Sequence, residues 1–112
     1  MSDKANKRDS LFDTLIAEAE AREAEAKDLE FKFEGVDVKI PAAKLNSLTW
    51  QLPFQRSDLV GAMNAILDTR TLAAILQSQY DDETETVSQV IVLKFWKEFS
   101  KAFDELGKST AS

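Results

Sequence analysis

The sequence predicts a mostly helical α+β protein: an N-terminal helix, one β-hairpin, and then a small bundle of about three helices. Three observations predict this class. Apolar residues recur at helical spacing near both ends of the chain, they alternate with charged residues between Leu29 and Ile40, and Pro41 stands where the alternation stops. In a chain of 112 residues we therefore expect a charged, partly helical arm over 1–28, a hairpin plus helical core over 29–107, and a polar tail over 108–112.

The arm is expected to begin as a frayed terminus, because residues 1–9 are polar or small. Ser10 and Asp13 then have the form of a capping box, which predicts that a helix starts there. Large apolar side chains follow at helical spacing, namely Leu11, Phe12, Leu15 and Ile16. Residues 18–27 are strong helix formers whose only apolar residue is Ala, so this half is predicted to be an exposed helix.

The hairpin is predicted from a period of two. Apolar residues alternate with charged ones from Leu29 to Phe33 and again from Val36 to Ile40. Glu34 and Gly35 lie between these runs, and Gly tolerates the positive φ that a two-residue hairpin turn needs. An isolated hairpin is only marginally stable, so its apolar face is expected to pack on helices.

The rest of the core is predicted to be helical after a connector. Residues 42–55 fit neither period, and we expect them to wrap the core and to contain a helical turn. Helices are expected with Ser57 as N-cap, over about Thr71–Gln79, and from about Thr86 to Leu106 with Gly107 as C-cap. The expected core residues are Phe31, Phe33, Val38, Leu59, Met63, Ile66, Ile91, Phe99 and Phe103.

Composition excludes several function classes. The chain has no Cys and no His, which excludes disulfides, thiolate nucleophiles and catalytic triads. Its net charge of −6 gives no field that would attract phosphates, so we expect neither nucleic-acid nor membrane binding. Without a signal peptide or a long apolar run, cytoplasmic localisation is expected.

Catalytic and metal sites are not predicted. The acidic loop containing Asp81, Asp82, Glu83 and Glu85 lacks the Gly and the spaced Glu of an EF-hand, so we interpret it as a solvated loop that favours the N-terminus of the next helix. No phosphate-binding or nucleophile motif occurs. We therefore expect no enzyme activity and no cofactor.

Apolar surface is the remaining candidate for function. The aromatic residues of the last helix cover more of its circumference than one neighbour can, so one flank is predicted to emerge as a binding strip. The large apolar side chains of the arm, from Leu11 to Ile16, are also expected to be buried, either by a second subunit or by a partner. The candidate protein-binding residues are Leu11, Phe12, Leu15, Ile16, Phe95 and Trp96.

The order of these features resembles a known family. The hairpin segment LEFKFEGVDVKIPAAKLNSLTW, the helix DLVGAMNAILD, and a terminal helix ending at Leu106 and Gly107 follow a charged, Ala/Glu-rich N-terminal helix, LFDTLIAEAEAREAEAK. Together they are similar to the tail assembly chaperones of long, non-contractile-tailed bacteriophages, especially those of actinobacterial hosts. The likeness covers about residues 11–107 and departs from the family over Leu52 to Arg56.

The resemblance implies a non-catalytic protein of the host cytoplasm. Such a chaperone keeps the tape measure protein soluble and brings tail tube subunits to it, and this chain would look like the shorter of the two forms that frameshifting commonly produces. Two other classes stay open from composition: an acidic mimic of nucleic acid, and a small regulatory or toxin-neutralising module.

Overall fold

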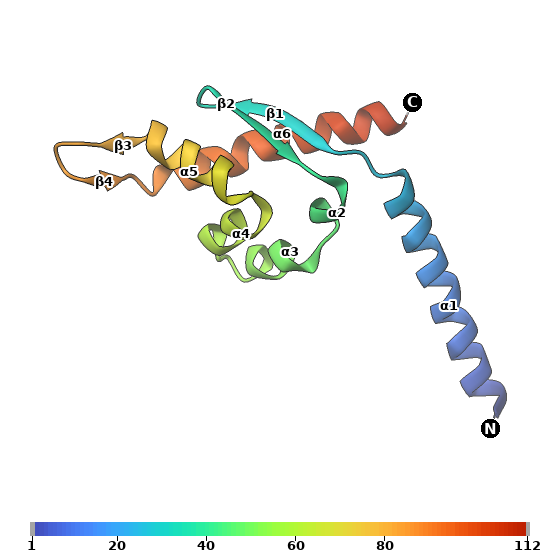
Figure 1. Ribbon diagram of the computed structural model, residues 1–112. Helices are drawn as coiled ribbons and strands as arrows, with labels where there is room; N and C mark the ends of the chain where they lie inside the picture. Colours follow the sequence, from blue (N-terminus) through green and yellow to red (C-terminus); the bar gives the residue numbers. More distant parts are fainter. Residues whose placement is uncertain (1, 112) are drawn as a thin grey trace.

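The computed structural model describes residues 2–111, and side chains over 9–107. One long helix crosses a β-hairpin, and shorter helices fill the space beside them (Figure 1). In chain order the elements are α1 Ser2–Glu25, β1 Leu29–Phe33, β2 Val36–Ile40, α2 Ala42–Leu45, α3 Leu48–Gln55, α4 Leu59–Ile66, α5 Thr69–Ser78, β3 Tyr80–Asp81, β4 Thr86–Val87 and α6 Val90–Ala111. The predicted α+β, mostly helical class is confirmed.

The hairpin forms where the alternation predicted it. Strands β1 and β2 pair antiparallel, with Leu29 opposite Ile40 and Phe33 opposite Val36. The turn residues Glu34 and Gly35 have φ values of 51° and 77°, the positive values of a two-residue hairpin turn. One face of the hairpin is buried because every second side chain points into the core.

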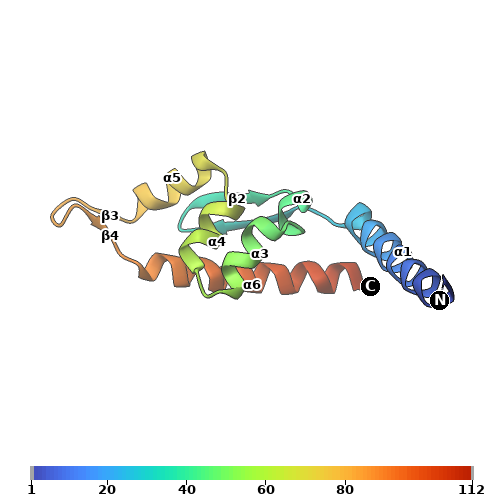
Figure 2. The same cartoon turned by 90° about the horizontal axis from the view of Figure 1, so that it is seen from below.

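The core lies between the hairpin and the helices. Figure 2 shows α5 on one side of the hairpin and α6 on the other. Phe95 of α6 is fully buried, and its ring centroid lies 5.9 Å from that of Phe31 and 5.7 Å from that of Phe33. Trp96 stacks on Trp50 of α3, with the centroids 5.6 Å apart. Aromatic residues of α6 thus join the hairpin to the connector helices.

Most of the predicted core residues are buried. Phe33, Val38, Met63, Ile66, Ile91 and Phe99 belong to the core, and Phe31 and Leu59 pack against it in part. Phe103 is a wrong prediction, since 47% of it is exposed. Its ring stacks on Phe99 with centroids 5.8 Å apart and lines an open hollow with Leu45 and Leu106.

Helix α4 starts one residue later than the sequence predicts, and α5 starts two residues earlier. Ser57 is not the N-cap of α4: it adopts a φ of 65°, and the side chain of Asp58 accepts the Gly61 N–H instead. Helix α5 starts at Thr69 because Asp68 caps it, accepting the Thr71 N–H at 2.7 Å. The connector forms two helices, α2 and α3, and the Ser47 hydroxyl accepts the Thr49 N–H at the start of the second.

Three further boundaries differ from prediction. Helix α1 starts at Ser2 rather than Ser10, since residues 2–9 contain no Gly or Pro to interrupt it. The acidic loop is the turn of a small hairpin, β3 and β4, and it ends before α6 starts at Val90, so its acids do not lie in the first turn of that helix. Gly107 does not end α6, which continues to Ala111, because glycine permits a helix end without imposing one.

Candidate protein-binding surfaces

The first candidate surface is an apolar stripe on α1, formed by Leu11, Phe12, Leu15 and Ile16. These side chains are 57%, 59%, 47% and 53% exposed, and helical spacing puts all four on one face. Helix α1 extends away from the rest of the chain (Figure 1), which gives the molecule extents of 69 × 33 × 20 Å. The stripe therefore lies away from the core and has no cover within the described residues.

The arm is held only at its base. Apart from Ala19, every residue from Asp9 to Glu25 is exposed. Asp28, just before β1, accepts the Ala42 N–H at 2.9 Å, and its carboxylate lies 3.9 Å from Lys39 Nζ. The end of the linker is thus fixed to the core, whereas the helix before it is not.

Phe95 and Trp96 are not surface residues, which corrects the prediction that they form a binding strip. Phe95 is 0% exposed and Trp96 is 6% exposed, and Trp96 Nε1 donates to the Leu59 carbonyl at 3.0 Å. The prediction failed because Phe31 and Phe33 of the hairpin pack on Phe95, and because the connector, which fits neither period, supplies Trp50 and Phe54 to cover Trp96.

The outer face of α6 carries a second apolar surface that sequence reasoning missed. Val90 and Leu93 are 47% and 58% exposed, and Val60 of α4, beside them, is 63% exposed. They line a hollow of about 360 Å³ with Leu59 and residues of the preceding loops. Further along the same face come three exposed basic residues, Lys94, Lys97 and Lys101. We call these six residues, Val60, Val90, Leu93, Lys94, Lys97 and Lys101, the outer α6 surface.

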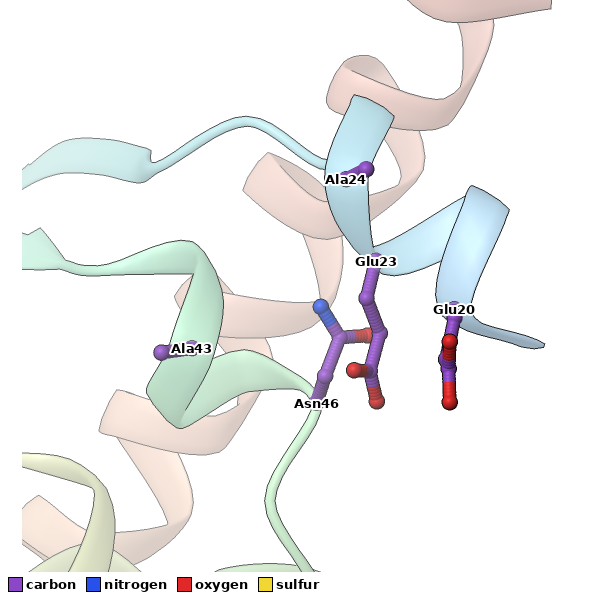
Figure 3. A pocket seen from close by; sticks show the side chains of 5 residues that line it. All are labelled: Glu20, Glu23, Ala24, Ala43 and Asn46. Carbon is purple, nitrogen blue, oxygen red and sulfur yellow. The ribbon is translucent and has the colours of Figure 1, made fainter. Parts of the chain in front are cut away.

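A hollow between α1 and α2 is the third candidate. It has a volume of about 420 Å³ and is lined by Glu20, Glu23 and Ala24 from α1 and by Ala43 and Asn46. Figure 3 shows the Glu23 carboxylate beside the Asn46 amide, with Glu20 one turn away. The two carboxylates and the amide lie at an open surface.

Asp81 accepts hydrogen bonds from other residues of the β3–β4 turn. Asp81 Oδ1 accepts the Glu83 N–H at 2.9 Å, and the Asp81 carbonyl accepts the Glu85 N–H at 2.8 Å. Across the described part of the chain, no three acidic, His or Cys side chains converge in a way that could hold a metal ion.

The lowered pKa of Asp68 has a structural cause, since its carboxylate accepts hydrogen bonds from the backbone and hydroxyl of Thr71.

Within residues 2–111, no helix is long and apolar enough to span a bilayer. Comparison of the chain with family models, curated proteins and solved structures found no match.

Proposed function

We propose that this chain is a non-catalytic phage tail assembly chaperone, which in the host cytoplasm binds the tape measure protein and helps to recruit tail tube subunits. The observation that carries the proposal is the α1 stripe: four large apolar side chains, each about half exposed, on a helix that leaves the core. The resemblance over residues 11–107 supplies the identity of the partners.

The stripe suits a helical partner. An amphipathic helix binds another helix through anchors three and four residues apart, which is the spacing of Leu11, Leu15 and their neighbours Phe12 and Ile16. Such a partner covers the stripe without requiring α1 to change its secondary structure. The acidic half of α1 that follows keeps the arm hydrated and disfavours wholly apolar aggregation.

The binding free energy of one stripe is small, which favours several copies of this chain on each tape measure protein, the client. Covering a half-exposed apolar side chain contributes about 1 kcal/mol, so one stripe supplies roughly 4 kcal/mol. Association itself costs about 4 kcal/mol or more in lost translational and rotational freedom. A single arm therefore binds weakly, and a long client gains solubility from several chaperones arranged along it.

Co-expression with the tape measure protein of the same genome tests the proposal. We expect more of that protein in the soluble fraction and a complex that survives moderate salt, because apolar contact is little screened. The double variant Leu11→Asp/Leu15→Asp should abolish both effects. Ala17→Asp/Ala21→Asp, with the same added charge on the opposite face of α1, should leave them unchanged.

Two outcomes would contradict the chaperone function. The first is equal solubility of the tape measure protein with and without this chain, with no complex at any salt concentration. The second is a basic partner bound in low salt and released steeply as salt rises, which would favour the acidic mimic or the regulatory module instead.

A further inference from the structure

Acidic residues border the apolar stripe of α1 along one of its long edges. Residues three and four apart are neighbours on the surface of a helix. Asp9 therefore lies beside Phe12, and Asp13 lies beside Ile16. Glu20, four residues after Ile16, continues the same edge.

The opposite edge of the stripe is acidic as well. Glu18 lies three residues after Leu15 and seven after Leu11, so it borders the stripe on the side away from Phe12 and Ile16. The stripe thus has a carboxylate on either side. We call these four residues, Asp9, Asp13, Glu18 and Glu20, the edge acids.

The edge acids are free to meet a partner. All four are exposed, and none belongs to an ion pair between described residues. No Lys or Arg stands three or four residues from Asp9, Asp13 or Glu20, and Glu18 has only Arg22 at that spacing. The first two also lie four residues apart, where like charges destabilise a helix. Within α1 the charge beside the stripe is therefore largely unbalanced.

Given the proposed function, on which this inference rests, we propose that the segment of the tape measure protein that covers the stripe is an amphipathic helix with Lys or Arg along both sides of its apolar face. The long stems of Lys and Arg pack on apolar surface while their charged ends reach outward. On such a helix the stems cover the margins of the stripe and the charged ends meet the edge acids. A helix with acidic flanks would bring carboxylates against carboxylates.

The same charges disfavour a second copy of α1 as the occupant. If two stripes faced each other in either direction, an acidic edge of one copy would meet an acidic edge of the other, because both edges carry carboxylates. Like charges across an interface oppose association. The stripe therefore suits a partner of opposite charge better than it suits itself.

The edge that contains Glu20 leads into the hollow between α1 and α2. Glu20 and Glu23 line this hollow together with Asn46, and Figure 3 shows the Glu23 carboxylate beside the Asn46 amide. Its volume of about 420 Å³ has room for the end of a long basic side chain. A client helix on the stripe can thus reach α2 at the base of the arm.

Apolar contact and charge have different roles in this binding. Exposed ion pairs each contribute little and are screened by salt. Burial of the stripe therefore supplies most of the affinity, and the edge acids select which helix binds. We expect the complex to persist in moderate salt, while the preference for basic flanks decreases.

Titration of the full isotope-labelled chain with synthetic helical peptides, followed by backbone amide shifts at low ionic strength, tests the inference. Three peptides of about 18 residues are long enough to form helices. The first has leucines at helical spacing and lysine flanks, the second has the same leucines and glutamate flanks, and the third has lysine flanks and serines in place of leucines. We expect the first to shift the amides of residues 11–16, and the other two to bind at least tenfold more weakly.

Matched variants show whether the edge acids cause the preference. Asp9→Asn/Asp13→Asn/Glu20→Gln should reduce the preference for lysine over glutamate flanks to threefold or less. Asp81→Asn/Asp82→Asn/Glu83→Gln removes the same number of charges from the β3–β4 turn, which lies far from α1 in Figure 1, and should leave the preference unchanged. Circular dichroism confirms that each variant is folded.

Several results would overturn the inference. Equal binding of the peptides with lysine and glutamate flanks would show that the stripe binds helices without regard to charge, which leaves the proposed function standing. Equal effects of the two triple variants would mean that only net charge matters. Shifts of residues 11–16 that depend on protein concentration without peptide, or contacts of the stripe with the core of the free chain, would identify a different occupant. Failure of the tape measure protein to bind in co-expression, with the peptide preference intact, would contradict the proposed function alone.

Discussion

Helices α1 and α6 carry similar apolar patterns and have opposite environments. Phe95, Trp96 and Phe99 of α6 are at most 6% exposed, whereas Phe12 and Leu15 of α1 are 59% and 47% exposed. The difference lies in the neighbours, since α6 is covered by β1 on one flank and by α3 and α4 on another, while α1 leaves the core after a short linker. An apolar stripe on a helix thus shows that one face is stabilised by burial, but it does not show which segment or partner buries it.

The largest difference between the two helices is expected in stability. Phe95→Ala removes a fully buried ring that contacts the hairpin and α6 itself, and should lower the free energy of unfolding by about 3–5 kcal/mol. Phe99→Ala, at 6% exposure, should have a similar cost. Phe12→Ala should change the free energy of unfolding by less than about 0.5 kcal/mol. Urea unfolding at low protein concentration measures all three, and a cost below about 1 kcal/mol for Phe95→Ala would contradict its place in the core.

A smaller effect is expected from the two tryptophan hydrogen bonds. Trp96→Phe removes a donor to the Leu59 carbonyl, which also accepts the helical Met63 N–H because Leu59 is the first residue of α4. Trp50→Phe removes a donor to the Leu45 carbonyl, which also accepts from Gln51 Nε2 at 3.0 Å. Because neither carbonyl is left without a donor, each variant should lower the free energy of unfolding by about 1 kcal/mol. A cost well above about 3 kcal/mol in urea unfolding would contradict this.

The cap of α5 should give a pH-dependent effect. Asp68→Ala removes the acceptor for the Thr71 N–H and should cost about 1 kcal/mol near neutral pH. Hydrogen bonds from Thr71 lower the folded-state pKa of Asp68 below its ordinary value of 3.8, so the stabilisation is present above that value and is lost as pH falls through the lowered pKa. Thermal unfolding from pH 7 to pH 2 should show the native chain and the variant converging in acid. A constant difference over this range would mean that the charge of Asp68 is not involved.

The smallest effect is expected from removing the arm. Deletion of residues 1–27 leaves Asp28 with its contacts to Ala42 and Lys39, so the remaining chain should unfold cooperatively with a nearly unchanged free energy of unfolding. Denaturant unfolding of the truncated chain measures this. A broad, non-cooperative transition would instead place α1 within the cooperative unit. The same deletion should abolish binding of the tape measure protein.

Local sequence determined the elements whose signals are local. The alternation from Leu29 to Ile40 with Gly35 at the turn specifies the hairpin, because side-chain direction in a strand and positive φ in a turn depend on neighbouring residues alone. The stripe at Leu11 to Ile16, followed by a segment without large apolar residues, likewise predicted an arm whose apolar face is exposed.

Tertiary structure decided which apolar residues are covered. Phe95 and Trp96 looked like surface residues in the sequence because the rings that cover them lie far away along the chain. Trp50 and Phe54 of the connector pack on Trp96, and Phe31 and Phe33 of the hairpin pack on Phe95. Phe103 lies on the same stripe as Phe99 and yet is half exposed, because it borders an open hollow that it lines with Leu45 and Leu106. Burial depends on contacts between residues distant in the chain, and periodicity along one helix carries no information about them.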